Sequence, residues 1–176
     1  ASALGRSLGI ADTTVRRYLD ILSGTFMIRQ LLPWLENIGK RQIKSPKIYF
    51  RDSGILHSLL GIKTERDLIN SPKLGSSWEG FALEETIRYL EVRGEEIFFW
   101  GTHQQAELDL LVFKGGKRIG FEFKHTDAPK VTKSMRIAMQ DLKLSQIKVI
   151  YSGNEIFPLD PQIQAVGLEV LTKLKI

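Results

Sequence analysis

The sequence has no cysteine among its 176 residues. Disulfide bonds and thiolate zinc sites are therefore excluded, and a reducing, cytoplasmic location is expected. Its three histidines, His57, His103 and His125, lack the spacing of metal ligands. No apolar run approaches the roughly 20 residues that cross a bilayer, and no signal-peptide pattern opens the chain, so we expect no membrane partner.

A G-x-x-x-x-G-K-[ST] phosphate loop is also absent, so this stretch cannot be a P-loop ATPase by itself. The chain starts at Ala1 inside a helical pattern without an initiator methionine, and we expect it to be a fragment of a longer protein. Hydrophobic residues make up 43% and charged residues 26%, the balance of a globular protein. The net charge of +5 permits a polyanionic partner without requiring one.

The first part of the chain reads as two short helices. A helix over residues 1–8 is broken by Gly9, and Asp12 offers an N-cap for a second helix that runs to about residue 22. An apolar stripe on the second helix leaves Arg16 and Arg17 pointing elsewhere.

Two strand-like runs follow, at residues 25–32 and 47–50, and a basic segment with Lys40 and Arg41 separates them. Two helices followed by a hairpin with a basic tip form a winged-helix arrangement, so Arg16, Arg17, Lys40 and Arg41 are candidate nucleic-acid contacts. The alternative is that these side chains are merely solvated or face a partner domain.

Turn residues near position 70 predict a boundary between a winged-helix-like domain, residues 1–70, and an α/β domain, residues 71–176. The second domain should contain a mixed central sheet flanked by helices. Its expected helices cover residues 78–93 and 130–144, its strands cover 96–100, 107–113, 117–124 and 147–151, and its tail is extended or mixed.

A diglycine, Gly115-Gly116, predicts a two-residue hairpin turn and thereby fixes a register in which partners have numbers that sum to 231. Leu108, Leu110 and Val112 then share one apolar face with their partners Phe123, Phe121 and Ile119.

On the other face of this hairpin, Asp109 should lie opposite Glu122, and Glu107 opposite Lys124. Two facing carboxylates repel each other, so the pattern calls for an offsetting cation. Lys124 is one candidate, and Mg²⁺ (or Mn²⁺) is another, because Mg²⁺ favours sites with one or two carboxylates.

The helix before the hairpin adds a third acid. Glu79 lies in the same helical arc as the apolar residues Ala82, Leu83, Ile87 and Leu90, whereas Glu84, Arg88 and Glu91 are expected to project away. An inward-facing carboxylate needs a partner, so Glu79 should point toward Asp109 and Glu122. The alternative is an ordinary set of surface ion pairs.

Glu79 on a helix, Asp109 on a strand and Glu122-Phe123-Lys124 on the next strand resemble the PD-(D/E)XK signature of restriction-endonuclease-like proteins. The wider chain resembles the uncharacterised region that follows the ATPase domain in many AAA-type ATPases of bacteria and archaea. The matching stretches are residues 47–54, 78–81, 107–111 and 121–124. Leu108 departs from the superfamily pattern, which has a proline before the aspartate.

The resemblance implies Mg²⁺-dependent hydrolysis of nucleic-acid phosphodiesters, with DNA favoured and an ATPase domain in the missing N-terminal part. Asp109, Glu122 and Glu79 would hold the metal, Lys124 would assist the attack, and Lys130 and Lys133 would contact the nucleic-acid backbone. Two alternatives stay open: a catalytically silent binding or regulatory module of the ATPase, and a transcription regulator that acts through residues 11–47.

Overall fold

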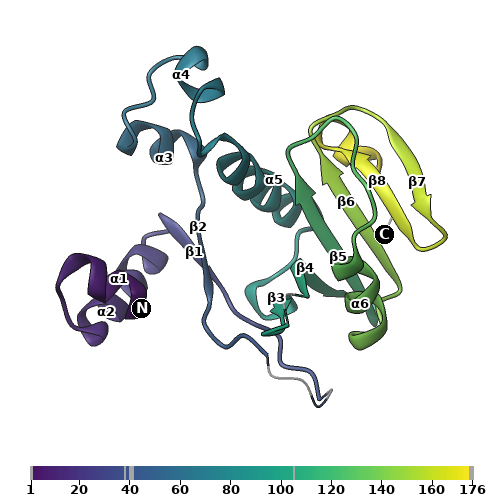
Figure 1. Ribbon diagram of the computed structural model, residues 1–176, viewed down its shortest axis with the longest axis horizontal. Coiled ribbons are helices and arrows are strands. Elements are labelled where there is room, and N and C mark those ends of the chain that lie inside the picture. The colour runs from purple at the N-terminus through teal and green to yellow at the C-terminus, as the bar shows by residue number, and fades with distance from the viewer. Residues whose placement is uncertain (1, 38, 40–41, 105, 175–176) are drawn as a thin grey trace.

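The computed structural model describes residues 2–37, 39, 42–104 and 106–174, and it contains a two-stranded sheet and a six-stranded mixed sheet flanked by helices (Figure 1). The α/β class expected from the sequence is therefore confirmed. No helix in these residues is long and apolar enough to cross a membrane.

The first part of the chain begins with helices α1 (Ser2–Leu8) and α2 (Asp12–Gly24), close to the predicted ranges. The predicted N-cap is wrong, because Ala11 is the N-cap residue of α2, makes no side-chain capping bond, and Asp12 lies in the first turn. Strands β1 (Ile28–Leu31) and β2 (Lys47–Phe50) pair antiparallel, and helices α3 (Ser53–Leu59) and α4 (Glu65–Ile69) follow. The connection between β1 and β2 touches the large sheet through isolated bridges from Pro33 to Phe99 and from Gln42 to Thr102.

The six-stranded sheet has the strand order β3-β4-β5-β6-β8-β7. Its strands are β3 (Ile97–Gly101), β4 (Glu107–Lys114), β5 (Lys117–Lys124), β6 (Gln146–Tyr151), β7 (Ile156–Asp160) and β8 (Ile163–Gly167). Strands β5, β6 and β8 run parallel, and the remaining pairs are antiparallel. The predicted tail thus forms two strands and the 3-10 helix η2 (Leu168–Lys173).

Helices cover both faces of this sheet. Helix α5 (Leu74–Leu90) and η2 pack on one face, in a core that includes Leu83, Phe121 and Leu171. Helix α6 (Lys133–Asp141) packs on the other face, in a core that includes Met135 and Leu108. Helix α5 begins four residues earlier than predicted. Helix α6 is shorter than predicted at both ends, because Thr132 caps its N-terminus and Leu142 is its C-cap.

The hairpin of β4 and β5 has the predicted register from Lys114 paired with Lys117 to Leu110 paired with Phe121. Both turn glycines have a positive φ, +57° at Gly115 and +73° at Gly116, as a tight hairpin of this type requires. The regular ladder ends there, and the expected opposed pairs of Asp109 with Glu122 and of Glu107 with Lys124 are not part of it.

A bulge in β4 explains the break. Strand β3 pairs Phe98 with Leu111 and Trp100 with Leu108, so two residues of β4, Asp109 and Leu110, lie opposite the single residue Phe99. The extra residue reverses the alternation of side chains. As a result Leu108 lies in the α6-side core while Leu110 lies in the α5-side core, and the prediction that both share one face is wrong.

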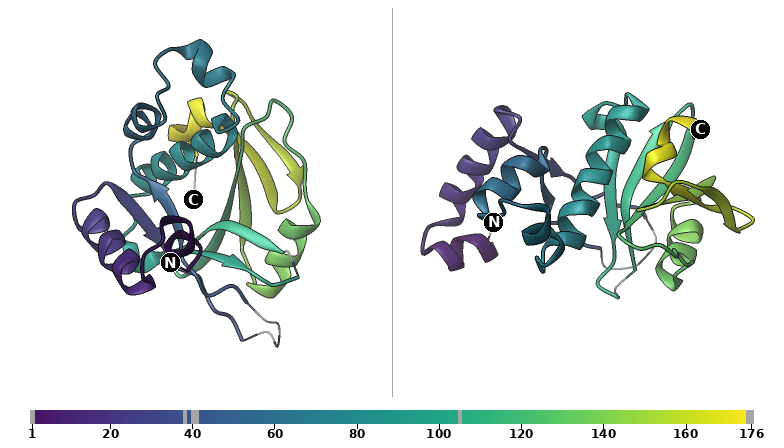
Figure 2. Two further views of the ribbon diagram at one scale, coloured as in Figure 1. Left: turned by 60° about the vertical axis from the view of Figure 1, so that its left-hand side comes forward. Right: turned by 90° about the horizontal axis from the view of Figure 1, so that it is seen from above.

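The two parts of the chain are joined by buried charges. Glu84 of α5 is 5% exposed, which contradicts the expectation that it projects away from the core. Its Oε1 and Oε2 accept from Nε and Nη2 of Arg29 at 2.5 and 2.9 Å, and Arg51 Nε lies 3.5 Å from Oε2. Seen from above, α1 and α2 lie at one end of the molecule and β7 and β8 at the other (Figure 2).

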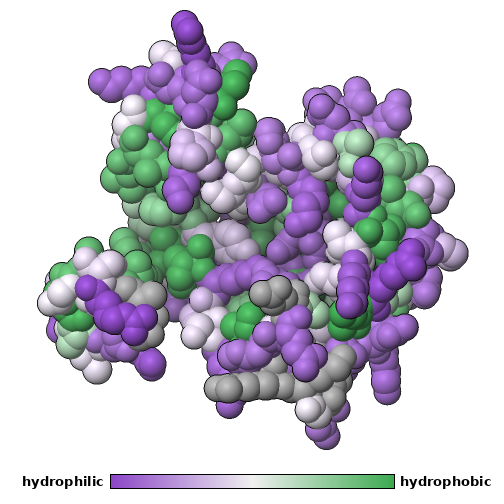
Figure 3. Space-filling model, in the orientation of Figure 1, coloured by the Kyte–Doolittle hydropathy of each residue, from purple (hydrophilic) through white to green (hydrophobic). Residues whose placement is uncertain are grey.

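An apolar groove of about 340 Å³ runs between β2, α3 and α5. Its lining includes the exposed side chains of Ile48, Leu60 and Phe81. Hydrophobic surface gathers over this region in Figure 3, whereas the face of the six-stranded sheet toward the viewer is mostly hydrophilic.

Candidate functional site

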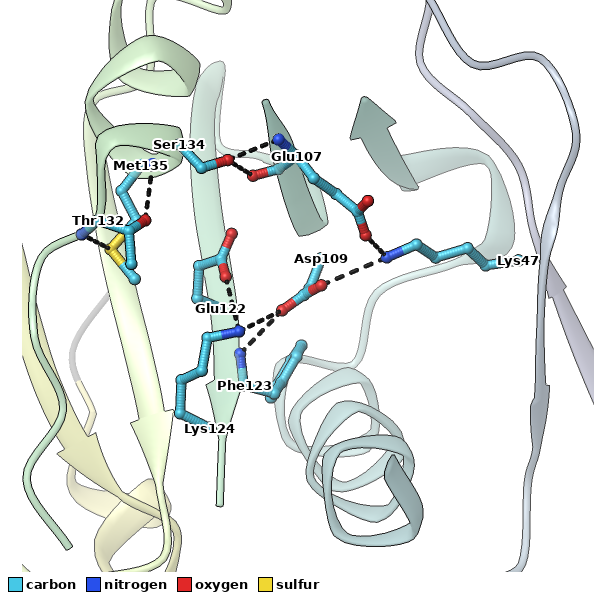
Figure 4. Close-up of polar contacts among 9 residues, drawn as sticks. All are labelled: Lys47, Glu107, Asp109, Glu122, Phe123, Lys124, Thr132, Ser134 and Met135. Carbon is cyan, nitrogen blue, oxygen red and sulfur yellow. Dashed lines mark hydrogen bonds and ion pairs between the residues drawn. The ribbon is translucent and has the colours of Figure 1, made fainter. Parts of the chain in front are cut away.

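Asp109 is at the centre of a charged cluster at the point where β4 and β5 separate (Figure 4). Its Oδ2 accepts from the backbone N–H of Phe123 at 3.2 Å, so its side chain takes the place of a ladder hydrogen bond on β5. The same oxygen lies 3.9 Å from Lys124 Nζ. The bulge in β4 therefore directs this carboxylate into the fork between the two strands.

Glu122 is the second acid of the cluster and is almost completely buried, with 5% of the residue exposed. Its Oε2 lies 3.4 Å from Lys124 Nζ. Burial first, and then the negative charge of Asp109, raise the pKa of the Glu122 carboxyl well above its ordinary value. Although the two acids are not opposed in the ladder, Lys124 brings them into one cluster, as the sequence predicted for this trio.

Burial alone would lower the pKa of the Lys124 ammonium. The negative charges of Asp109, Glu122 and Glu79 outweigh the burial and raise this pKa instead. Lys124 is consequently a fixed positive charge between the acids.

Glu79 supplies a third acidic group from helix α5, and its side chain is half-buried. Burial raises the pKa of its carboxyl, the charge of Lys124 opposes this, and the charge of Asp109 adds to it. Glu79 is thus close enough to sense the strand acids, although no three His, Cys, Asp or Glu side chains within the described residues lie close enough to share a metal ion.

Two residues of β2 also reach the cluster, and sequence reasoning did not single them out. Lys47 Nζ pairs with Glu107 Oε1 and lies 3.3 Å from Asp109 Oδ1. Tyr49 lies beside them, and burial, opposed by Lys47 and reinforced by Asp109 and Glu107, raises the pKa of its hydroxyl to about 12. Glu107 therefore pairs with Lys47 and not, as predicted, with Lys124.

The start of β4 is held in place by helix α6. Ser134 Oγ accepts from the backbone N–H of Glu107 and donates to the carbonyl oxygen of the same residue, both at 2.6 Å. This reciprocal pair fixes Glu107 two residues before Asp109, and no sequence pattern pointed to Ser134.

The predicted nucleic-acid contacts are spread over separate parts of the molecule. Arg16 and Arg17 are exposed on α2, Lys133 is exposed as the first residue of α6, and Lys130 is exposed in the loop before this helix. Lys40 and Arg41 fall outside the described residues. The described candidates thus form two groups at a distance from each other in the fold (Figure 1).

The donor chemistry of the cluster fits a hard divalent cation. Four carboxylates, Glu79, Glu107, Asp109 and Glu122, face two ammonium groups, Lys47 and Lys124, so the formal charge of the cluster is −2. Mg²⁺ and Mn²⁺ bind through one or two carboxylates and complete their shells with water and phosphate oxygens. Asp109 and Glu122 would hold such an ion.

Comparison with known proteins shows that the chain is similar to mycobacterial proteins. It is 50% identical over 163 residues to the uncharacterized protein Rv2008c of Mycobacterium tuberculosis and, equally, to the uncharacterized protein Mb2031c of Mycobacterium bovis. The match covers 93% of this chain but 36% of each relative, so the chain spans about a third of their length. No solved structure matches.

Two family models match consecutive stretches. The first, a domain of unknown function (DUF8612), matches residues 1–66 and includes Lys47 and Tyr49. The second matches residues 74–171, more than half of the chain, and includes Glu79, Asp109, Glu122 and Lys124. The chain therefore belongs to the family described as domain of unknown function DUF4143.

Proposed function

We propose that the chain is the nuclease-like part of an AAA-type ATPase, with a restriction-endonuclease-like core, and that it hydrolyses nucleic-acid phosphodiesters with the help of Mg²⁺ or Mn²⁺. The observation that carries the proposal is the convergence of Asp109, Glu122 and Lys124 where β4 and β5 separate. The mixed sheet, with an acid-bearing helix before it, supports the core assignment, and α1, α2, β1 and β2 support a winged-helix-like start.

The role of each residue in this proposal follows from its charge. Asp109 and Glu122 would hold the cation, which would neutralise charge on the phosphate. Glu79, on α5, adds a further negative charge near these two acids. Lys124, fixed between two acids, orients the attacking water or stabilises the charge that develops on the phosphate oxygens. Exposed Lys130, in the loop before α6, and exposed Lys133, the first residue of α6, can contact the nucleic-acid backbone.

A cleavage assay tests this function. Supercoiled plasmid and single-stranded RNA are incubated with the chain in Mg²⁺ or Mn²⁺, and nicked or shortened products are followed over time. Asp109→Ala and Lys124→Met should each lower the rate by about a hundredfold or more, as removal of a charge-stabilising group commonly does. Asp20→Ala, which removes an exposed acid on α2, is the matched control and should cleave like the native chain.

One observation favours a second function, a catalytically silent module that binds nucleic acid or regulates the ATPase. Both oxygens of Asp109 already have lysine partners, and the described residues hold no group of three potential metal ligands. Cleavage that is equal for the native chain and Asp109→Ala, or absent from both, together with retained nucleic-acid binding, would favour this role over hydrolysis.

A further inference from the structure

Lys47 is placed where a cation bound to Asp109 would have to lie. The Oδ2 atom of Asp109 is occupied by the N–H of Phe123 and by Lys124. The Oδ1 atom is therefore the oxygen left for a further cation, and Lys47 Nζ lies 3.3 Å from it. Figure 4 shows the lysine reaching this oxygen from the opposite side to Lys124.

The position of Lys47 is set by the first part of the chain. Lys47 pairs in register with Leu31, which is 1% exposed, and Lys47 Nζ also lies 5.3 Å from the centre of the Phe99 ring. Two residues further along β2, the ring of Tyr49 packs against α5 at Gly80, next to Glu79. The ammonium group thus enters the site from a strand that is held on both sides.

An ammonium group and a divalent cation at the same carboxylate oxygen weaken each other's binding, because their positive charges repel each other in a half-buried site. The Lys47 side chain is also a flexible stem that carries a compact charge, so it can leave the oxygen without unfolding β2. Binding of the metal would then release Lys47 from Asp109 and leave it with Glu107.

We propose that Lys47 is an internal counterion that competes with the divalent cation for Asp109, so that the first part of the chain sets the cation affinity of the site in the second part. This inference rests on the proposed function, because it assumes a cation site at Asp109 and Glu122. Displacement of β2 away from β4 would raise the affinity, and firm docking of β2 would lower it.

Calorimetric titration of the whole chain with MnCl₂ tests the competition. Lys47→Met and Lys47→Gln remove the charge and should bind Mn²⁺ at least about tenfold more tightly than the native chain, a difference of roughly 1.4 kcal/mol. Lys47→Arg keeps the charge and should stay near the native affinity. Lys44→Met removes an exposed lysine of the preceding segment and is the matched control.

Two neutral variants are used so that a folding defect in one of them does not decide the result. Melting curves with and without Mn²⁺ show whether each variant is folded, and Mn²⁺ should raise the melting temperature more in the neutral variants than in the native chain. Native binding that is not tightened by either neutral variant would overturn the counterion role and leave the metal site standing. Absence of Mn²⁺ binding from the folded native chain and from both neutral variants would overturn the metal site itself. Binding by the neutral variants alone would support the competition.

Discussion

Glu122 combines deep burial with a negative neighbour, and both properties disfavour the charged form of its carboxyl in the folded chain. The carboxylate is held close to Asp109 with little access to water, and Lys124 offsets only part of the repulsion. Strongly perturbed carboxyls of this kind gather at functional sites, where stability is exchanged for reactivity. The ionised carboxylate of Glu122 should therefore lower the free energy of unfolding of the metal-free chain.

We predict that Glu122→Gln stabilises the metal-free chain at pH 8 by on the order of 1 kcal/mol and that the gain shrinks at pH 5.5. Because folding raises the pKa of Glu122, the folded native chain binds a proton more tightly than the unfolded chain does. Native stability from this group is therefore present at low pH and is lost as the pH rises through the raised pKa. Urea unfolding in EDTA at both pH values measures the difference.

Glu95→Gln serves as the control for this titration, because Glu95 is an exposed acid near the start of β3. Its effect should be small at both pH values. A loss of stability in Glu122→Gln of equal size at pH 8 and pH 5.5 would contradict the prediction, since it would indicate lost packing and not a buried charge.

The hairpin of β4 and β5 is the element whose geometry places the site. Its turn depends on backbone angles that only glycine and a few polar residues adopt readily, and nothing lies within 4 Å of a Cβ added at Gly115 or Gly116. A substitution at either glycine therefore tests the effect of the backbone conformation alone, because the added side chain would not clash with other atoms.

The double substitution Gly115→Ala/Gly116→Ala should lower the free energy of unfolding by roughly 2 kcal/mol, because each alanine must adopt a left-handed conformation. Gly115→Asn is the matched variant and should cost little, since asparagine followed by glycine suits this turn. Urea denaturation compares the three chains. Equal stability of the double-alanine and native chains would show that the turn does not hold the register.

Short-range patterns in the sequence predicted this element well. The diglycine and the alternating apolar residues were enough to give the register from Leu110 to Phe121, because both are properties of one contiguous segment. The bulge at Asp109 and Leu110 was not predictable in this way. It depends on the pairing of β4 with β3, and therefore on which residue faces Phe99.

The same distinction separates the correct from the incorrect predictions of charge partners. Lys124 and Glu122 are two residues apart, and their association follows from the strand itself. The bonds of Glu84 with Arg29 and of Lys47 with Glu107 and Asp109 span 55 to 62 positions, across the joint between the two parts. Helical periodicity placed Glu84 on the solvent side because it carries no information about arginines in the first part of the chain.

For the molecule as a whole, the pair of Arg29 and Glu84 joins the two parts of the chain. Its side chains are only 15% and 5% exposed, and Arg29 bonds both carboxylate oxygens. Removal of one partner from a buried pair leaves an uncompensated charge, which costs far more than the pair contributes.

Arg29→Met should destabilise the chain by roughly 3–5 kcal/mol, and the double variant Arg29→Met/Glu84→Met should recover much of that loss. Arg88→Met, which removes an exposed arginine of α5, should change stability by less than about 0.5 kcal/mol. Thermal and urea unfolding of the four chains measure these differences. A loss in Arg29→Met no larger than in Arg88→Met would show that the joint is not held by this pair.

Glu84 thus has a consequence for recombination among related proteins. In a hybrid made by a crossover between residues 51 and 84, Arg29 and Arg51 come from one parent and Glu84 comes from the other. The hybrid has all three residues only if each parent carries its share of them. A hybrid that keeps Glu84 but loses Arg29, or keeps Arg29 but loses Glu84, would have an unpaired charge inside the protein. Exchange points upstream of position 29 avoid that hazard.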